Sequence, residues 1–380
     1  MKIALVHDWL TGMRGGEKCL EALCQLYPEA EIFTLLHNRN STSPEIESKR
    51  IHTSFVQHLP SAAEKYRYYL PLFPTAIERF DLSAYKLVIS SSHCVAKGVL
   101  TKIETCHICY CHTPMRYVWE MSAIYFNHSR YNWVRRVLTN SMLNYLRRWD
   151  LSSTSRVDHF VANSQNVRHR IKKHYDRQAD VIYPPVEIDS FTLGPERGNY
   201  YLIVSALVPY KRIDLAVEAF NQLGKRLVIV GSGPEEKRLK KMAQGKIEFV
   251  PWQGFEQLKE FYQNCKALIF PGEEDFGIVP VEAQACGKPV IAFGQGGVLE
   301  TVQGIYPDRQ QSNKSSNTGV FFREQAAASL IGAVKYFETL EFDRNIIRQS
   351  VLRFKAENYK EKMKEFVTRK LEIHRQTFNS

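Results

Sequence analysis

Short apolar runs alternate with helix-like segments over most of this 380-residue chain. The first series of apolar runs lies at residues 2–7, 31–36, 86–91, 106–112 and 159–163. The second series lies at residues 200–206, 226–230, 247–250, 267–270 and 289–293. Intervening segments, such as 17–26 and 213–223, carry apolar residues at helical spacing. This alternation predicts parallel sheets that are covered by helices on both faces.

A stretch with the composition of a linker separates the two series. Residues 181–200 hold paired prolines, followed by polar residues and two glycines. A chain of this length also exceeds what one hydrophobic core usually organises. We therefore expect two doubly wound α/β domains that face each other across a cleft, with ligands at the carboxyl ends of the strands. Residues 308–318 predict an exposed loop, and the chain after residue 338 predicts only charged helix.

The formal net charge of +11 and the isoelectric point near 9.1 indicate a polyanionic partner. Nucleic acid, phosphates and an acidic membrane all satisfy this charge, and charge alone does not choose among them. The first residues lack the pattern of a secretory signal, and no apolar run reaches the ~18–20 residues of a membrane span. A cytoplasmic location with reduced cysteines is the expectation.

The segment from Thr105 to Glu120, TCHICYCHTPMRYVWE, raises the question of a metal site, because residues 106–112 hold five potential ligands. On a strand, Cys106 and His112 lie on one face, whereas His107 and Cys109 lie on the other. No face then presents four ligands, and no second C-x-x-C pair is present. The spacing predicts no metal site, and it places His112 at the carboxyl end of the strand, where a ligand is expected.

Residues 269–297 read as a strand, an acidic loop, a helix and a second strand. The helix is expected to start near residues 279–280, with Gly287 closing it. Unpaired backbone N–H groups of Gly277, Ile278 and Val279 would favour an anion such as a phosphate. Glu282 could accept hydrogen bonds from a ribose diol, and Glu274 from sugar hydroxyls. Alternatively, each carboxylate is a solvated or helix-dipole-favoured glutamate without a ligand.

The order and content of these segments resemble a known family. Glu274 and Glu282 stand in the pattern E-x-F-G-x-x-x-x-E-A-x-A-x-G-K-P-V, which is similar to the signature of the retaining GT-B glycosyltransferases, family four. Further blocks of that family match in order and cover most of the chain: VISSSHCVAKGV, CHTPMRYVWE, FVANSQNVRHRI, VIYPPVEIDSF, VSALVPYKRIDLAVEAF, IVGSGPEEKRL and GGVLETV. The resemblance implies a GT-B fold of two Rossmann-like domains. These are an acceptor domain at residues 1–185, with a helix at 355–380 packing back onto it, and a donor domain at 195–354.

The resemblance also implies roles for individual residues. Glu274 would bind the transferred hexose, Glu282 the ribose hydroxyls, and Lys211 the leaving diphosphate. Together with His112, which contacts the hexose or the reacting centre in such enzymes, Lys211 and Glu274 form the implied catalytic set. Further donor contacts are expected at the following residues: Gly15, Gly16, Gly233, Trp252, Phe276, Gly277, Ile278 and Val279. For Gly233, a tight turn without a ligand is the alternative.

One position departs from the family pattern. Where the family often has an arginine before the lysine, this chain has Ala206, and Arg212 directly follows Lys211. We expect Arg212 to supply the second phosphate contact. A surface arginine at a helix start is the alternative, and the sequence favours neither.

Arg116 and Trp119 are expected on the acceptor side, by analogy with the family. Two other stretches, 65–73 and 129–149, mix aromatic and basic residues. The second would suit a helix on an anionic bilayer, or equally a helix packed on the sheet with a solvated basic face. Lipid-linked acceptors in the family favour peripheral association with the inner face of the cell membrane.

The function implied is a metal-independent, retaining hexosyltransferase of surface-polysaccharide synthesis. Its partners would be a nucleotide-diphosphate sugar, with UDP-glucose favoured over GDP-mannose, and a saccharide acceptor of the lipid-linked kind. No cofactor and no nucleic acid are expected. The alternatives are a GT-B epimerase or phosphorylase and a non-catalytic nucleic-acid binder. No helix-turn-helix or zinc pattern supports the latter.

Overall fold

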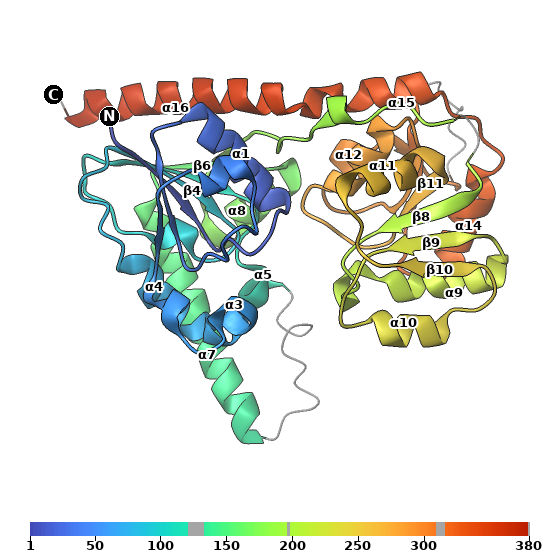
Figure 1. The fold of residues 1–380 in the computed structure, drawn as a ribbon, viewed down its shortest axis with the longest axis horizontal. Coiled ribbons are helices and arrows are strands. Elements are labelled where there is room, and N and C mark those ends of the chain that lie inside the picture. Colours follow the sequence, from blue (N-terminus) through green and yellow to red (C-terminus); the bar gives the residue numbers. More distant parts are fainter. Residues whose placement is uncertain (121–132, 196–197, 309–315, 379–380) are drawn as a thin grey trace. The chain divides into compact units, whose positions relative to one another are not determined.

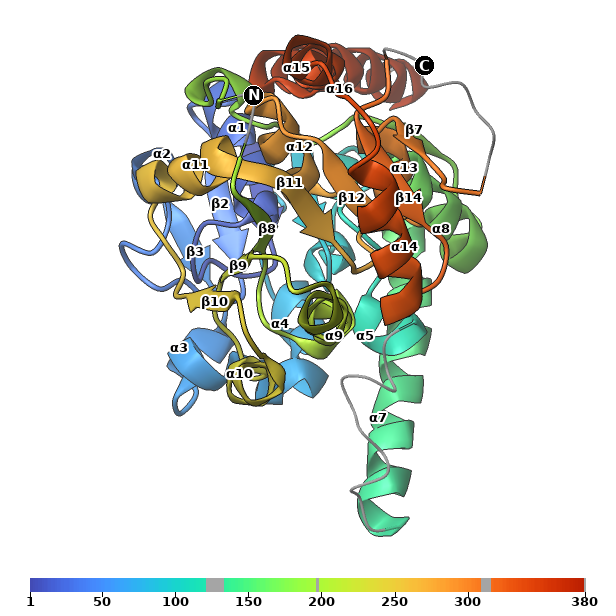
Figure 2. The same ribbon diagram turned by 90° about the vertical axis from the view of Figure 1, so that its right-hand side faces the viewer.

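The computed structural model describes residues 1–120, 133–195, 198–308 and 316–378. It divides the chain into two units, which are described separately. Unit 1 comprises Met1–Pro185 and Ala356–Ser380, and unit 2 comprises Val186–Lys355. Both are α/β units built on a parallel sheet (Figures 1 and 2). Within the described ranges, no helix combines the length and apolarity needed to cross a bilayer.

Unit 1 contains a seven-stranded sheet in the order β3-β2-β1-β4-β5-β6-β7, with all pairs parallel. Its strands are β1 (Ile3–His7), β2 (Glu31–Thr34), β3 (Ile51–Thr53), β4 (Leu87–Ser92), β5 (Cys106–Cys111), β6 (His159–Ala162) and β7 (Ala179–Val181). The five apolar runs of the first series are confirmed as strands. The two strands at the sheet edges, β3 and β7, were not predicted, because three partly exposed residues carry too little periodicity.

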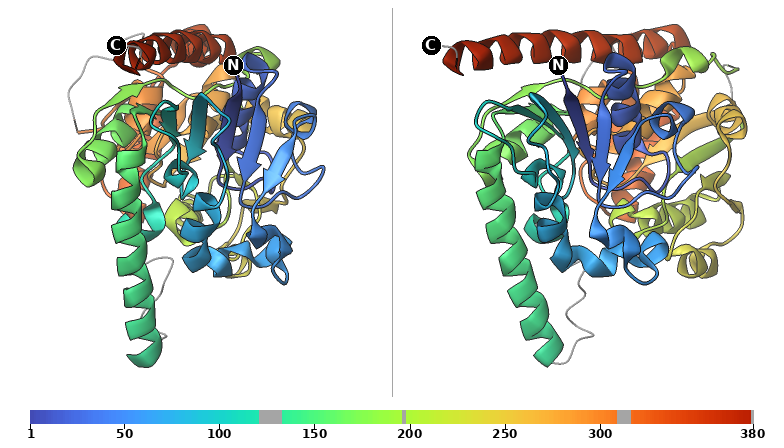
Figure 3. Two further views of the ribbon diagram at one scale, coloured as in Figure 1. Left: turned by 90° about the vertical axis from the view of Figure 1, so that its left-hand side faces the viewer. Right: turned by 60° about the vertical axis from the view of Figure 1, so that its left-hand side comes forward.

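Helices cover both faces of this sheet (Figure 3). They are α1 (Gly15–Leu26), α2 (Pro44–Glu47), α3 (Ala62–Lys65), α4 (Phe73–Glu78), α5 (Arg116–Trp119), α7 (Trp133–Ser152), α8 (Gln165–Tyr175) and α16 (Ala356–Phe378), with 3-10 turns η1 (Phe55–His58), η2 (Tyr66–Leu72), η3 (Ala96–Gly98) and η5 (Ser153–Arg156). The C-terminal helix α16 belongs to unit 1, since Tyr359, Met363 and Phe366 are buried in one cluster with Leu20 of α1 and Ile108 of β5.

Unit 2 repeats this plan in the order β10-β9-β8-β11-β12-β14-β13. Its strands are β8 (Tyr200–Val204), β9 (Leu227–Val230), β10 (Ile247–Val250), β11 (Cys265–Phe270), β12 (Val290–Phe293), β13 (Gly304–Ile305) and β14 (Gly319–Phe322). The second series is confirmed as strands, whereas β13 and β14 were missed. β14 is a buried four-residue run. Of the loop predicted before it, residues 309–315 lie outside the described residues.

The helices of unit 2 are α9 (Ile213–Leu223), α10 (Glu236–Met242), α11 (Phe255–Asn264), α12 (Ile278–Ala285), α13 (Val298–Thr301), α14 (Ala327–Phe337) and α15 (Arg344–Val351), with η6 (Ile188–Ser190), η7 (Pro209–Lys211) and η8 (Leu352–Phe354). Part of the stretch expected to be a linker packs on this unit. Phe191 is buried and contacts the rings of Phe255 and Tyr262.

Strand order reverses once in each sheet, between β1 and β4 in unit 1 and between β8 and β11 in unit 2. In doubly wound sheets, the chain leaves these two strands in opposite directions, and the divergence opens a ligand site at their carboxyl ends. The segments that follow β1, β4 and β5, and those that follow β8 and β11, are therefore the places to examine.

Candidate active site

In unit 2, the loop between β11 and α12 is shaped by glycine and by a buried aromatic ring. Gly277 has a φ of +91°, which residues with a Cβ rarely adopt, and α12 begins at the next residue, close to the predicted start. Gly287 ends the helix with a φ of +75°, as expected. Phe276 is buried, with its ring 5.2 Å from that of Phe354. The loop is thus anchored directly before the first residues of α12, Ile278 and Val279, which are partly exposed.

Glu274 and Lys211 meet directly. The Lys211 ammonium donates a hydrogen bond to Oε1 of Glu274, and each side chain is 21% exposed. The backbone of Glu274 accepts a 2.8 Å hydrogen bond from the N–H of Gly297, so the β12–α13 turn holds the loop. A Cβ on Gly272 would lie 3.0 Å from the Cα of Lys211. The structure thus brings together two of the three residues expected to be catalytic, and both remain reachable from solvent.

Arg212 follows Lys211 in the left-handed conformation, with a φ of +54°. Its guanidinium lies 3.3 Å from Oδ1 of Asp214 and 3.4 Å from Oε1 of Gln325. The side-chain amide of Gln325 donates in turn to the carbonyl of Pro271, at the start of the glutamate loop. Arg212 is therefore linked to that loop through Gln325, and its contact with a phosphate stays a prediction.

Glu282 lies on α12 and is held by a tyrosine that sequence reasoning missed. The hydroxyl of Tyr262, on α11, donates a 2.6 Å hydrogen bond to Oε2 of Glu282. Tyr262 is completely buried, and burial together with the neighbouring Glu282 raises its pKa well above the usual value. The hydroxyl therefore remains a donor at neutral pH. No motif marks Tyr262, because its partner lies 20 positions away on another helix.

The other donor-side candidates of unit 2 have different surroundings. A Cβ on Gly233 would overlap the carbonyl oxygen of Leu207, so close backbone packing already requires this glycine. Trp252 follows β10, and its side chain is 60% exposed. The indole is thus available for contact with a planar group, which leaves its predicted role open to test.

In unit 1, the start of α1 and the end of β5 lie side by side. Gly15 and Gly16 are the first residues of α1, and His112 follows the last residue of β5. A Cβ on Gly16 would lie 3.3 Å from Cε1 of His7 and 3.7 Å from Nε2 of His112. A side chain at Gly16 would therefore have to displace the His7 ring by a few tenths of an ångström, and His112, which is partly buried, lies in contact with the start of the helix.

A network that the sequence analysis did not anticipate surrounds His112. The Oγ of Ser91 lies 2.8 Å from Nε2 of His112 and 3.1 Å from Nδ1 of His7. Burial lowers the pKa of His112 well below its usual value, and the neighbouring rings of His93 and His7 lower it further. His112 is therefore a neutral imidazole at physiological pH.

Asp8, which follows β1, fixes the neighbouring loop. Its two carboxylate oxygens accept hydrogen bonds from four consecutive backbone N–H groups, those of residues 93–96, and Nδ1 of His93 lies 3.0 Å from Oδ2. A usable signal was present in the sequence. The pairs His7–Asp8 and Ser91–Ser92 end two apolar runs, and the carboxyl ends of adjacent parallel strands share one edge of a sheet.

Arg116 and Trp119, the candidates for the acceptor side, both lie on the short helix α5. The indole N–H of Trp119 donates a 2.7 Å hydrogen bond to Oδ2 of Asp150, on α7, and its ring stacks on that of His174. Asp150 is buried and also pairs with Lys97 at 2.9 Å. Trp119 thus anchors α5 to α7, whatever its role toward an acceptor.

The cysteine-rich strand alternates as predicted. Cys106, Ile108 and Tyr110 share one core cluster, whereas Cys109 and Cys111 share another. All eight cysteines are free and buried. Burial raises the pKa of Cys106 to about 12, so this thiol is protonated at neutral pH.

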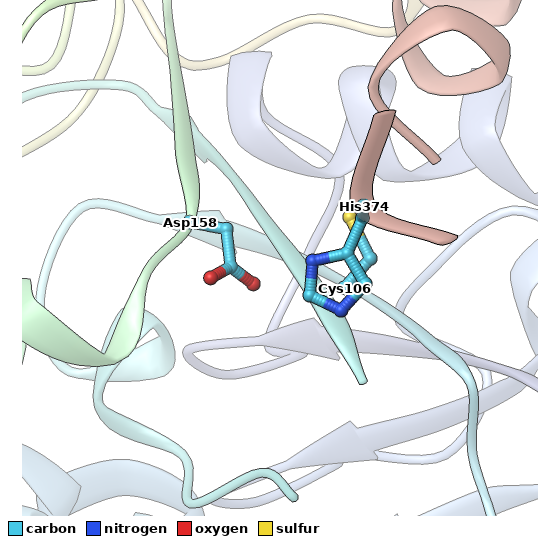
Figure 4. Close-up of side chains that lie close together, drawn as sticks. All are labelled: Cys106, Asp158 and His374. Atoms are coloured by element: carbon cyan, nitrogen blue, oxygen red, sulfur yellow. The ribbon is translucent and has the colours of Figure 1, made fainter. Parts of the chain in front are cut away.

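A metal-capable group nevertheless includes one residue of that strand. Ligand atoms of Cys106, Asp158 and His374 lie within 4.8 Å of one another, from the start of β5, the residue before β6 and the end of α16 (Figure 4). Oδ2 of Asp158 already accepts a hydrogen bond from the backbone N–H of His107. The positive charge of the nearby Lys370 offsets a part of the rise in the pKa of Cys106. The group is at the amino end of β5, opposite His112, and the absence of a metal requirement stays a prediction.

Two family models match the chain, one on each unit. Residues 13–190 match Glycosyltransferase Family 4, and residues 186–352 match Glycosyl transferases group 1. The chain belongs to the glycosyltransferases that these models describe, and its two seven-stranded parallel sheets correspond to the two Rossmann-like domains of the GT-B fold.

Relatives with names include an uncharacterized glycosyltransferase of Methanocaldococcus jannaschii, 29% identical over 40% of this chain and 44% of its own length. The O-antigen chain mannosyltransferase RfbU of Salmonella typhimurium is 30% identical over 37% of this chain and 43% of its own length. The alpha-1,3/1,6-mannosyltransferase of Candida glabrata is 24% identical over 84% and 81%. The matched region spans less than half the length of the first two relatives.

Solved structures share the fold over nearly the whole chain. Anabaena HepE in complex with UDP-glucose has a TM-score of 0.68 at 16% identity and covers 97% of this chain and 100% of its own. The sucrose-phosphate synthase of Thermosynechococcus elongatus has a TM-score of 0.68 at 17% identity and covers 100% of both chains. At such identities the likeness establishes the fold alone.

Proposed function

We propose that this chain is a retaining hexosyltransferase that moves a hexose from a nucleotide-diphosphate sugar to a hydroxyl of a saccharide acceptor. The observation that carries the proposal is the Lys211–Glu274 ion pair, in which Glu274 belongs to the loop that leads into α12 of unit 2. Family membership on both units supports it. In this account the sugar nucleotide is a substrate, and no cofactor is required.

The pair of charges in unit 2 suits a donor that carries both phosphate and sugar. A diphosphate would compete with the Glu274 carboxylate for the Lys211 ammonium, while a hexose hydroxyl would donate to the released carboxylate. The first amides of α12 would add hydrogen bonds to the diphosphate. Glu282, held by Tyr262, would accept the ribose hydroxyls. The diphosphate, the hexose and the ribose of the donor would thus each have a partner of matching chemistry within one unit.

The reaction breaks the bond between the hexose C1 and a phosphate oxygen and forms a bond between C1 and an acceptor oxygen. The bonding electrons leave with the diphosphate, and the acceptor proton passes to a phosphate oxygen. Lys211 and the α12 amides would stabilise the charge that develops on the leaving group, which is the contribution that raises kcat. No metal is needed in this scheme, because protein cations neutralise the diphosphate.

A transfer assay tests this function. The full chain is incubated with radiolabelled UDP-glucose or GDP-mannose and an extract of lipid-linked saccharides, with and without EDTA. We expect labelled product from one donor, the same anomeric configuration as the donor, and a rate that EDTA changes less than twofold. UDP-glucose is the first choice, and GDP-mannose the second. Conversion of the donor without an acceptor would instead indicate an epimerase.

The helix α7 supports a membrane-associated acceptor. The second half of this helix is buried in the core of unit 1 through Leu143, Leu146 and Trp149. This half therefore packs within the unit and is not available to a bilayer. Its first half carries an exposed apolar stripe, which consists of Trp133, Val134, Val137 and Leu138. Figure 3 shows this half extending beyond the sheet of its own unit. Exposed Arg136 lies within this half, and exposed Arg148 lies in the second half of the same helix, so positive charge accompanies the stripe.

We propose that this stripe lies on an anionic bilayer, where apolar burial and positive charge act together. The double variant W133S/L138S should lose co-sedimentation with phosphatidylglycerol vesicles at physiological salt. The control I103S/I373S changes exposed apolar residues elsewhere in unit 1 and should retain it. Equal vesicle binding by both variants, or no binding by the unchanged protein, would contradict the assignment.

A further inference from the structure

A chain of four side chains runs through unit 1 and ends at His112. Its order is Glu17, His7, Ser91 and His112, drawn from α1 and from the ends of β1, β4 and β5. Oε1 of Glu17 lies 3.8 Å from Nε2 of His7, and Ser91 bridges Nδ1 of His7 and Nε2 of His112 at 3.1 Å and 2.8 Å. His7 and Ser91 are completely buried, whereas His112 is partly exposed.

Glu17 joins this chain to the glycine-rich helix start. Its Oε2 accepts a 3.1 Å hydrogen bond from the backbone N–H of Arg14, directly before Gly15. Burial raises the pKa of Glu17, but the interaction with His7, 3.8 Å away, outweighs it, so the net pKa falls below the usual value. A buried, ionised carboxylate therefore faces Nε2 of His7.

The charge on Glu17 decides where the protons lie. A lone pair on Nε2 of His7 would be repelled by the Glu17 carboxylate, so this nitrogen carries a proton. With one proton on the ring, Nδ1 of His7 then has the lone pair. Ser91 then donates its single hydroxyl proton to Nδ1 of His7, and its oxygen accepts from Nε2–H of His112. This order leaves Nδ1 of His112 as a hydrogen-bond acceptor, a nitrogen not engaged elsewhere in the described part of the chain.

We propose that Ser91, backed by His7 and Glu17, is a positioning residue that fixes the tautomer of His112, so that Nδ1 accepts a hydrogen bond from a substrate hydroxyl. The inference rests on the proposed function, because the hydroxyl belongs to the transferred sugar or its acceptor. Arg14, His93, Tyr110 and Asp8 are other charged or titratable groups around the chain. The Asp8 carboxylate pairs with His93 and with four backbone N–H groups and lies outside the chain of donors.

The neighbouring residue on the same strand provides a matched control. Ser90 is as buried as Ser91 and also bonds a histidine, with its Oγ 2.9 Å from Nε2 of His107. Because side chains alternate along β4, Ser90 faces the opposite side of the sheet. The substitutions S90A and S91A remove the same group at similar burial, but only S91A breaks the chain to His112.

The test combines ring-nitrogen NMR of protein labelled with ¹⁵N-histidine and steady-state kinetics. In the unchanged protein, His112 should be neutral at pH 7.5, with the proton on Nε2. S91A should lose this single tautomer and lower kcat about tenfold, the size of one hydrogen bond. The donor KM should change less than twofold. S90A should retain both the tautomer and kcat, and S91T, which keeps the hydroxyl, should recover most of kcat.

The outcomes separate this inference from the proposed function. Absence of transfer by the unchanged protein would overturn the function, whereas the His112 tautomer is still read directly by NMR. An Nδ1–H tautomer in the unchanged protein, or an S91A variant with unaltered tautomer and kcat, would overturn the inference. If S91A does not fold, the inference is tested by the NMR spectrum of His112 in the unchanged protein and in E17Q. E17Q removes the charge while keeping a carbonyl acceptor for Arg14, and it should populate both tautomers.

Discussion

The two units place polar side chains at the carboxyl ends of similarly ordered strands, but they use opposite electrostatics. In unit 2, the site is an ion pair, with Lys211 and Glu274 each 21% exposed. In unit 1, the corresponding region is built from imidazole rings and a buried serine around His112. All 12 histidines of the chain lie in the segments that form unit 1, and unit 2 has none.

This difference indicates a division of labour. Exposed, opposite charges can exchange partners with a charged ligand at little cost, because water and the ligand replace what each charge loses. Buried neutral groups instead keep fixed hydrogen bonds and can orient an uncharged hydroxyl. Unit 2 is therefore suited to hold the charged nucleotide-sugar donor, and unit 1 to orient a sugar hydroxyl.

The largest expected effect comes from removing the cation of unit 2. K211A should lower kcat about a hundredfold or more, since a group that stabilises the leaving charge acts mainly in the transition state. K240A is the control, because Lys240 also pairs with a glutamate, Glu236, on the surface of the same unit. Initial rates at saturating donor measure the effect. Equal rates for the two variants would remove Lys211 from the proposed mechanism.

Acid should destabilise unit 1 and spare unit 2 between pH 7.5 and pH 5. Burial lowers the pKa of His107 to about 4 in the folded unit. In the unfolded chain its pKa is near 6.5, so at pH 5 the unfolded chain binds a proton on His107 and the folded unit does not. Stability is thus lost as pH falls, by about 2 kcal/mol at pH 5 for His107 alone. The lowered pKa values of His93 and His112 act in the same direction.

Scanning calorimetry at the two pH values measures this contrast. The transition of unit 1 should move to lower temperature at pH 5, while that of unit 2 moves little, because unit 2 contains no histidine. A transition of unit 1 that stays in place, or rises, would show that the buried histidines are already protonated at neutral pH.

A smaller effect is expected at the ribose contact. E282Q keeps an acceptor for the Tyr262 hydroxyl but removes the charge, and it should raise the donor KM about tenfold, the size of a charge-assisted hydrogen bond. Y262F should raise it about threefold by freeing Glu282. The control variant E256Q, at the exposed start of α11, should leave the donor KM unchanged. A larger increase in the donor KM for Y262F than for E282Q would show that Tyr262 acts on stability and not on donor binding.

Most of the fold could be predicted because its strands carry strong local signals. The ten apolar runs all became strands, and the end of α12 at Gly287 follows from local backbone chemistry. The edge strands β3 and β13 were not predicted, because they hold only three and two residues and form only by pairing with a neighbouring strand. Segments whose conformation is imposed by tertiary contacts carry little signal of their own.

The site was predictable only where a linear motif carries it. Glu274, Glu282 and Lys211 stand in motifs, and the structure pairs the first with the third. Ser91, Tyr262 and Glu17 support functional candidates through contacts between elements distant in sequence, so spacing could not reveal them. Gly233 shows the opposite case, in which backbone packing alone explains a motif glycine.

The most direct test of the account is the binding of nucleotides to the full chain, measured as the shift in melting temperature. UDP, GDP, ADP, dTDP and their common sugar conjugates are compared on the unchanged protein, K211A and K240A. A ligand that binds only the folded state raises the melting temperature in proportion to the logarithm of its concentration over Kd. We predict a clear rise with one nucleotide family, with UDP first, that is lost in K211A and kept in K240A. No rise with any nucleotide in the folded, unchanged protein would contradict the donor site assigned to unit 2.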